Sequence, residues 1–121
     1  MTYSEKKKAS KNILEAIYGL KGREEIKVQY GTGYKGKPNY YWIKGYESKR
    51  GEMSYSIWSG YSGMNIDSLG PTTAKAYTYD MMSQRTSYSF PLYEMSVVVE
   101  IEDPLKQLEG YMGTEKGILT K

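Results

Sequence analysis

The chain contains no cysteine and no histidine. Disulfide and thiolate chemistry is therefore absent, and so are the most common general base and the most common transition-metal ligand. Zinc sites, Ser-His-Asp triads and Cys-His dyads are excluded. We expect no cofactor and no bound metal, and we predict that the protein is not an enzyme.

Long apolar runs are also missing. No stretch approaches the roughly 18 apolar residues that a membrane span needs. The N-terminal sequence M-T-Y-S-E-K-K-K lacks the apolar core of a signal peptide. We therefore expect a protein without membrane contact that is intracellular, in the cytoplasm of its own cell or of an infected host, and is not secreted.

The length of 121 residues suits one domain, which can bury roughly two-thirds of the surface that the unfolded chain exposes. No linker or repeat interrupts residues 1–112, which we predict to form a single α+β domain. Residues 113–121 supply no apolar face and are predicted to be a frayed C-terminal tail.

Charge and aromatic residues are unevenly distributed. The first 50 residues carry ten Lys and two Arg against five Glu, a net charge of +7, whereas residues 51–121 carry four Lys and one Arg against six Glu and three Asp, a net charge of −4. Tyrosine outnumbers phenylalanine by 14 to 1, and tyrosine is favoured where a ring meets water or another molecule. A basic, aromatic half is typical of a protein with a polyanionic partner.

Two compositional biases suggest a source. Lys and Glu are abundant while Asn and Gln number three each, a pattern associated with thermophiles. The small size and the missing catalytic groups fit a viral protein by association.

The first half of the chain predicts one helix followed by three strands. Thr2 and Glu5 have the spacing of a capping box, and the helix that follows ends at Gly19 or Gly22. Apolar and polar residues then alternate in three stretches joined by turns, which predicts an antiparallel meander. The three strands are residues 25–30, 39–46 and 53–58.

The second half is less regular. Residues 59–70 have the composition of a loop, residues 72–84 fit a helix better than a strand, and residues 83–91 form a connection. Residues 94–102 alternate as a strand, with Met95, Val97, Val99 and Ile101 expected to point inward. Asp103 opens a short helix to Gly110. The fold class is therefore α+β, an antiparallel sheet of about four strands with helices packed on one face, in the order α-β-β-β-α-β-α.

The register of the meander selects the candidate binding residues. If Ile26, Val28 and Ile43 face the helices, the opposite face of the sheet is aromatic and basic. Rings on such a face can stack with bases while lysines meet phosphates, as in single-strand-binding sheets. The residues that we predict to bind nucleic acid, a nucleotide or another partner are Lys27, Tyr34, Lys35, Lys37, Tyr40, Trp42, Lys44, Tyr46 and Trp58.

Residues 31–36 match the pattern G-x-G-x-x-G, but the dinucleotide-binding fingerprint must open a helix, and here Lys37 and Pro38 lead into a strand. A mobile hairpin loop is the favoured interpretation. The alternative is a loop whose amides, with Lys35 and Lys37, contact a phosphate.

Two alternatives to nucleic acid remain open for the aromatic face, and an enzyme remains a separate one. It can engage a protein partner, as in a virus-encoded inhibitor or a homodimeric accessory protein, because Tyr and Trp also anchor protein interfaces. It can be covered by another segment and belong to the core. An enzyme would have to use the carboxylates of Glu100, Glu102 and Asp103 as an acid and base pair or as magnesium ligands.

Overall fold

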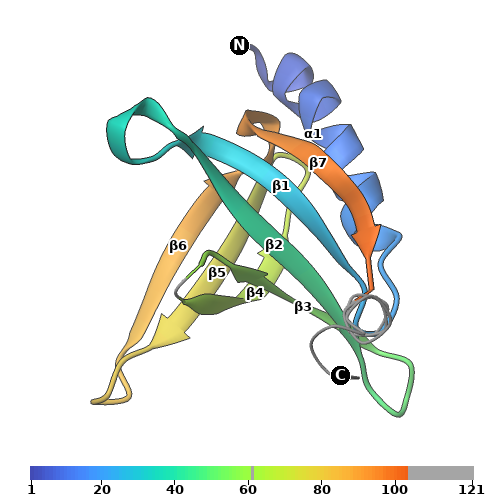
Figure 1. Cartoon of the computed structure of the whole chain (residues 1–121). Helices are drawn as coiled ribbons and strands as arrows, with labels where there is room; N and C mark the ends of the chain where they lie inside the picture. The colour runs from blue at the N-terminus through green and yellow to red at the C-terminus, as the bar shows by residue number, and fades with distance from the viewer. Residues whose placement is uncertain (61, 104–121) are drawn as a thin grey trace, which may run out of the picture.

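The structure, a computed structural model, describes residues 1–60 and 62–103. Within these ranges the chain forms one α-helix, seven strands and two 3-10 turns (Figure 1). The elements in chain order are α1 (Tyr3–Tyr18), β1 (Glu25–Thr32), η1 (Tyr34–Gly36), β2 (Pro38–Glu47), β3 (Met53–Trp58), β4 (Gly63–Leu69), β5 (Thr73–Tyr79), β6 (Arg85–Pro91), η2 (Leu92–Glu94) and β7 (Met95–Glu102).

The described strands form one antiparallel sheet in the order β6-β5-β4-β3-β2-β1-β7. The predicted sheet of about four strands with helices packed on one face is therefore wrong. The predicted helix, the three-strand meander and the strand near residue 94 are confirmed as α1, β1 to β3 and β7. The short helix expected after Asp103 and the tail from 113 to 121 fall outside the described residues.

The largest errors concern β4 and β5. The predicted loop at 59–70 contains β4, in which Met64 and Ile66 face the core while the outward residues are polar. A register shift between Ile66 and Ser68 interrupts the alternation of apolar and polar residues, which made the strand hard to recognise in the sequence. The predicted helix at 72–84 contains β5. Its inward residues Ala74 and Ala76 are small, so they fit a helix pattern as readily as a strand pattern, yet both are buried against neighbouring strands.

The predicted connection at 83–91 contains the edge strand β6. Five of its seven residues are exposed, so its sequence lacks the apolar alternation of a half-buried strand. Pro91 ends this strand, a position compatible with an edge, where a missing N–H costs no ladder hydrogen bond.

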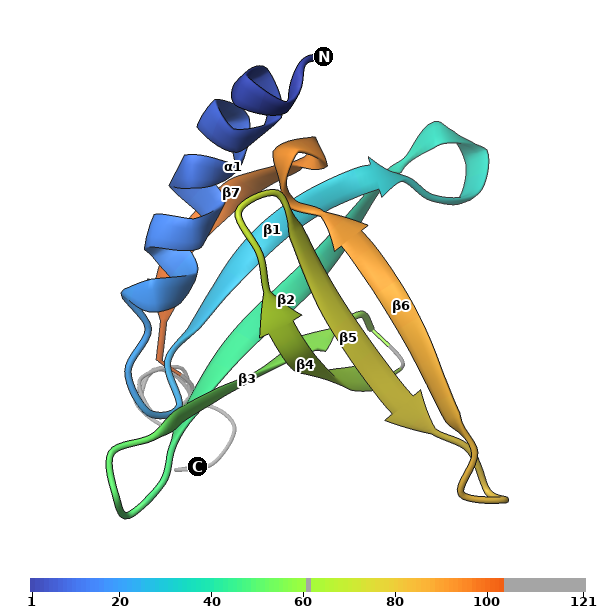
Figure 2. The ribbon, with the colours of Figure 1, turned by 180° about the vertical axis from the view of Figure 1, so that it is seen from behind.

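The sheet curls so far that its two ends meet around the core. Phe90 of β6 lies 5.8 Å from Tyr30 of β1 and 6.1 Å from Tyr41 of β2, measured between ring centroids, although three strands separate β6 from β2 in the sheet. The short turn η2 carries the chain from one edge strand to the other (Figures 1 and 2). The concave face therefore encloses most of the buried apolar side chains.

Helix α1 packs on this concave side. Ile13 and Ile17 are buried in the same cluster as Ile26, Val28 and Ile43, and Figure 2 shows the helix alongside β1 and β7. The capping box is confirmed, because the Thr2 hydroxyl accepts from the Glu5 N–H at 3.1 Å and the Glu5 carboxylate accepts from the Thr2 N–H at 3.0 Å. In the described part of the chain, no helix combines the length and the apolar character needed to cross a membrane.

Candidate nucleic-acid interface

The convex side of the sheet carries the candidate residues. Because Ile26, Val28, Ile43 and Ile57 are buried against the concave core, the residues between them face away from it. The predicted sidedness of the meander is therefore confirmed, and within the described residues helix α1 packs on the opposite, concave side. We call the convex surface formed by Lys27, Tyr40, Trp42, Lys44, Tyr46 and Trp58 the outer aromatic face.

Strand pairing places these side chains in rows. Lys27 of β1 is paired with Trp42 of β2, and Trp42 is paired with Trp58 of β3. Directly paired residues project from the same side of a sheet at short range. The two tryptophans of the chain therefore lie beside each other on the outer aromatic face.

The lysines of this face lie over its rings. The Lys27 ammonium is 4.6 Å from the centroid of the Tyr40 ring and 5.4 Å from that of Trp42, and the Lys44 ammonium is 5.9 Å from the Tyr46 ring. Such cation–π contacts hold the rings and the charges together at the surface. An ammonium has three donors, so hydrogen-bonding capacity remains for a ligand.

Between the two tryptophans the surface is hollowed. This tryptophan hollow has a volume of about 410 Å³ and is lined by Glu25, Trp42, Lys44, Trp58, Ser59 and Gly60. Tyr40 and Trp58 each expose 43% of their surface on either side of Trp42. The hollow is therefore a shallow site with aromatic walls and one charge of each sign.

The Trp58 indole is fixed by its neighbours. Its Nε1–H donates to the Ser56 hydroxyl at 3.1 Å, and its ring lies over Gly63, where an added Cβ would approach ring atoms at 2.6 to 2.8 Å. Gly63 is paired with Trp58 across β3 and β4. The missing side chain at Gly63 therefore creates the flat seat on which the indole rests.

Glu25 and Lys44 form an ion pair in the hollow. Their charged atoms lie 3.9 Å apart, and the two side chains are only 12% and 25% exposed, respectively. Burial raises the pKa of the Glu25 carboxyl; Lys44 lowers it in part and nearby Glu102 adds to the rise. This carboxylate is therefore less well solvated than an ordinary surface glutamate.

The glycine-rich segment forms the end of the β1–β2 hairpin, so its predicted place in a hairpin is confirmed. Gly31 and Gly36 have positive φ angles of 64° and 73°, and Lys35 adopts 58°. The exposed Lys35 and Lys37 lie at this end of the hairpin and do not line the tryptophan hollow. The side chain of Tyr34 is outside the described part of the structure.

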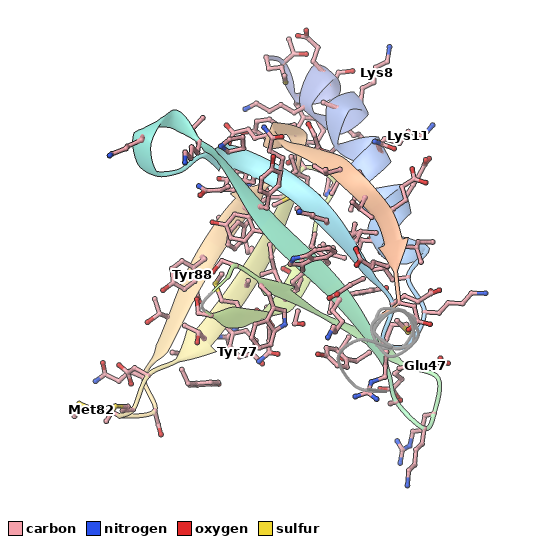
Figure 3. The ribbon with its side chains drawn as sticks, in the orientation of Figure 1. Lys8, Lys11, Glu47, Tyr77, Met82 and Tyr88 are labelled. Atoms are coloured by element: carbon pink, nitrogen blue, oxygen red, sulfur yellow. The ribbon has the colours of Figure 1, made fainter. Side chains whose placement is uncertain are left out.

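Sequence reasoning missed the part of the convex side formed by β4 to β6, because it did not recognise these strands. Arg85 stacks on Tyr77, with its guanidinium carbon 4.2 Å from the ring centroid, and bonds to Asp67 at 2.8 Å. Strand pairing links Lys44 to Ser56, Ser56 to Asn65 and Asn65 to Tyr77. Tyr77, labelled in Figure 3, therefore lies in the same row across the sheet as Lys44. The alternation of Lys75, Tyr77 and Tyr79 was the available signal.

Glu100 and Glu102 of β7 are not brought together. Register shifts and the positive φ of Ile101 place Glu102 opposite Glu25, whereas Glu100 lines a hollow beside α1. Val99 is paired with Lys27 and exposed, so its predicted inward orientation is wrong, whereas the half-exposed Ile101 lines the hollow beside α1 together with Ile26. Among the described residues, no group of three or more carboxylates is arranged to hold a metal ion.

Comparisons with models of protein families, with curated proteins and with solved structures find no match for this chain.

Proposed function

We propose that the protein binds nucleic acid or a nucleotide through the outer aromatic face, with single strands as the preferred form. The observation that carries this proposal is the pair of tryptophans beside a hollow that also contains Lys44. Each base that stacks on an aromatic side chain contributes about 1–3 kcal/mol, and stacking requires that the ring be accessible from solvent.

The dimensions of the face support this function. From Tyr40 to Tyr46, β2 spans about 20 Å at the usual rise of a strand. Along this length the face carries three rings, with Lys27 beside the first two and Lys44 between Trp42 and Tyr46. Bases can therefore lie on the rings while the phosphates that join them contact the lysines.

Both tryptophans of the chain lie at the proposed site, so their fluorescence reports binding without a label. We expect single-stranded oligonucleotides to quench it in a saturable manner. The affinity should fall steeply between about 50 mM and 200 mM salt, because phosphate contacts release counterions. The Trp42→Ala, Lys44→Ala double variant should bind about 10- to 100-fold more weakly, the equivalent of one stacked base.

A matched control removes a ring and a lysine elsewhere. Tyr3 and Lys8 are exposed on α1, where Figure 3 shows Lys8 pointing away from the sheet. The Tyr3→Ala, Lys8→Ala variant should bind as the wild type does. Equal binding by the wild type and the Trp42→Ala, Lys44→Ala variant at low salt would contradict the proposal.

A protein partner, including a second copy of the chain, is the second candidate. Strand β7 favours this candidate, because β1 is its only neighbour among the described strands. β7 also exposes Val98 and Val99 next to Lys27. An exposed apolar edge is a template for strand addition. Sedimentation and affinity capture separate the candidates: a strict monomer that captures no protein contradicts this one, and a ring-anchored interface responds weakly to salt.

A further inference from the structure

The two charged groups of the tryptophan hollow form a specific arrangement of donors and acceptors. The Glu25 carboxylate offers two acceptor oxygens, and the Lys44 ammonium beside it offers donors. They come from directly paired positions of β1 and β2, so both are fixed to the same part of the sheet. Their separation of 3.9 Å exceeds hydrogen-bond range, which leaves both able to bond to a ligand.

The rings restrict how a planar ligand can approach. Lys27 lies over the Trp42 ring from the β1 side, and it is not part of the lining of the hollow. The Trp42 surface that lines the hollow is therefore the one toward Lys44 and Trp58. Gly60 also lines the hollow and has no side chain, and a Cβ added there would meet no atom within 4 Å outside its two chain neighbours. A planar ring that stacks on Trp42 within this hollow would lie beside Glu25 and Lys44, which line it.

We propose that the tryptophan hollow accepts one guanine base, stacked on Trp42 with its Watson–Crick edge toward Glu25 and Lys44. This inference rests on the proposed function. The N1–H and N2–H groups of guanine donate to the two carboxylate oxygens, and its O6 accepts from the ammonium. Single-stranded bases are read through such edges, and bidentate hydrogen bonds to a carboxylate are among the stronger ones.

Other bases complement this pair less well. Adenine and cytosine offer one exocyclic amine on this edge, while uracil and thymine offer one ring N–H, so none of them presents two adjacent donors to a carboxylate. Guanine also stabilises the Glu25 carboxylate most. Burial and the nearby Glu102 disfavour its charged form, and the two N–H donors of guanine replace the hydration that burial removes. A bidentate contact discriminates by roughly 10- to 100-fold.

The test compares oligonucleotides of thymidines that contain one guanine, one inosine or one adenine, titrated against the full chain by tryptophan fluorescence. Inosine lacks only the N2 amine. We expect the guanine oligonucleotide to bind at least about tenfold more tightly than the other two. Glu25→Gln should abolish this preference, and Glu52→Gln, an exposed residue of the β2–β3 turn, should leave both the preference and the affinity for thymidine alone unchanged.

The outcomes are distinct. If all three oligonucleotides quench the tryptophans with equal affinity for the wild type, the guanine assignment is wrong while the proposed function stands. If none of them quenches at low salt, the proposed function fails as well. Because the guanine and inosine comparison uses the wild-type protein, it decides the question even if Glu25→Gln does not fold.

Discussion

Gly63 and Trp58 show how a residue without a side chain positions a candidate binding group. The indole occupies the space above Gly63 and is anchored at its edge by Ser56. Glycine weakens an isolated strand because it has no side chain to pack, and an aromatic ring from the neighbouring strand compensates for this. Within the predicted loop at 59–70, Gly63 was therefore a packing signal rather than a loop signal.

We expect Gly63→Ala to displace the Trp58 indole, because the new Cβ would lie 2.6 to 2.8 Å from ring atoms. The ¹H–¹⁵N spectrum should show a large shift of one of the two indole N–H signals, and oligonucleotide affinity should fall by about tenfold, the lower end for one stacked base. Gly60→Ala is the control for the indole signals, because its Cβ meets no atom within 4 Å. Unchanged indole signals in Gly63→Ala would contradict this account.

At the residue scale, much of the outer aromatic face was predictable from alternation. Tyr40, Trp42 and Lys44 follow one another at a period of two, and burial of Ile43 on the other side fixes which way they point. Glu25 also alternates with Ile26, but its role depends on Lys44, which is 19 positions away and becomes a neighbour only through strand pairing. Spacing within one strand contains no information about that partner.

At the scale of elements, α1 is the part whose limits follow most directly from local chemistry. Two reciprocal hydrogen bonds at Thr2 and Glu5 satisfy N–H groups that the first helical turn leaves without partners. At the other end, the Gly19 N–H donates to the carbonyl of Glu15 at 3.0 Å. Both ends depend on residues within a few positions of each other, so the sequence alone predicts them.

We expect Thr2→Ala to lower the free energy of unfolding by about 1 kcal/mol, as is typical when a helix N-cap is removed, and Thr2→Ser to retain most of it. Hydrogen bonds from Thr2 hold the pKa of the Glu5 carboxyl below its ordinary value of 4.5. A carboxyl whose pKa is lower in the folded than in the unfolded protein stabilises the fold at pH values above its unfolded pKa. This contribution is lost as the pH falls through the pKa of the folded state. Urea unfolding near neutral pH and at acid pH measures both effects.

That prediction has a clear contrary outcome. The Glu5 contribution should decrease on acidification, so Glu5→Gln should destabilise the protein near neutral pH and have less effect once the carboxyl is protonated. A Glu5→Gln effect that grows on acidification, or a Thr2→Ala variant as stable as the wild type, would contradict the capping account.

The strands of the second half illustrate the opposite case. Lys75, Tyr77 and Tyr79 alternate with Ala74 and Ala76, but alanine is a strong helix former and gives no preference for a strand. What selects the strand is pairing with β4 on one side and β6 on the other. An element that is held by two neighbours need not contain a strong signal of its own.

At the scale of the whole molecule, the curl of the sheet joins its two ends. Phe90 is the only phenylalanine of the chain, and it is buried between Tyr30 and Tyr41. Edge-to-face ring pairs of this kind add to the free energy gained by burial. Phe90 thus connects β6 to β1 and β2, and it helps to maintain the curvature that makes the outer aromatic face convex.

We expect Phe90→Ala to destabilise the protein by about 3–5 kcal/mol, the usual cost of truncating a buried phenylalanine. Phe90→Leu fills most of the volume and should cost much less. Denaturant unfolding monitored by circular dichroism gives both values. A loss of under about 1 kcal/mol in Phe90→Ala would show that the contact between the ends of the sheet contributes little.

The sequence by itself determined the features that depend on near neighbours: the absence of cysteine and histidine chemistry, the start and end of α1, and the side of the meander on which each ring lies. The tertiary structure alone decided the number of strands, the curl of the sheet, and the hollow in which Glu25 and Lys44 meet between two tryptophans. The reason is physical. Periodicity and capping act over a few residues, whereas pairing between strands brings together groups whose separation along the chain is not fixed by any local rule.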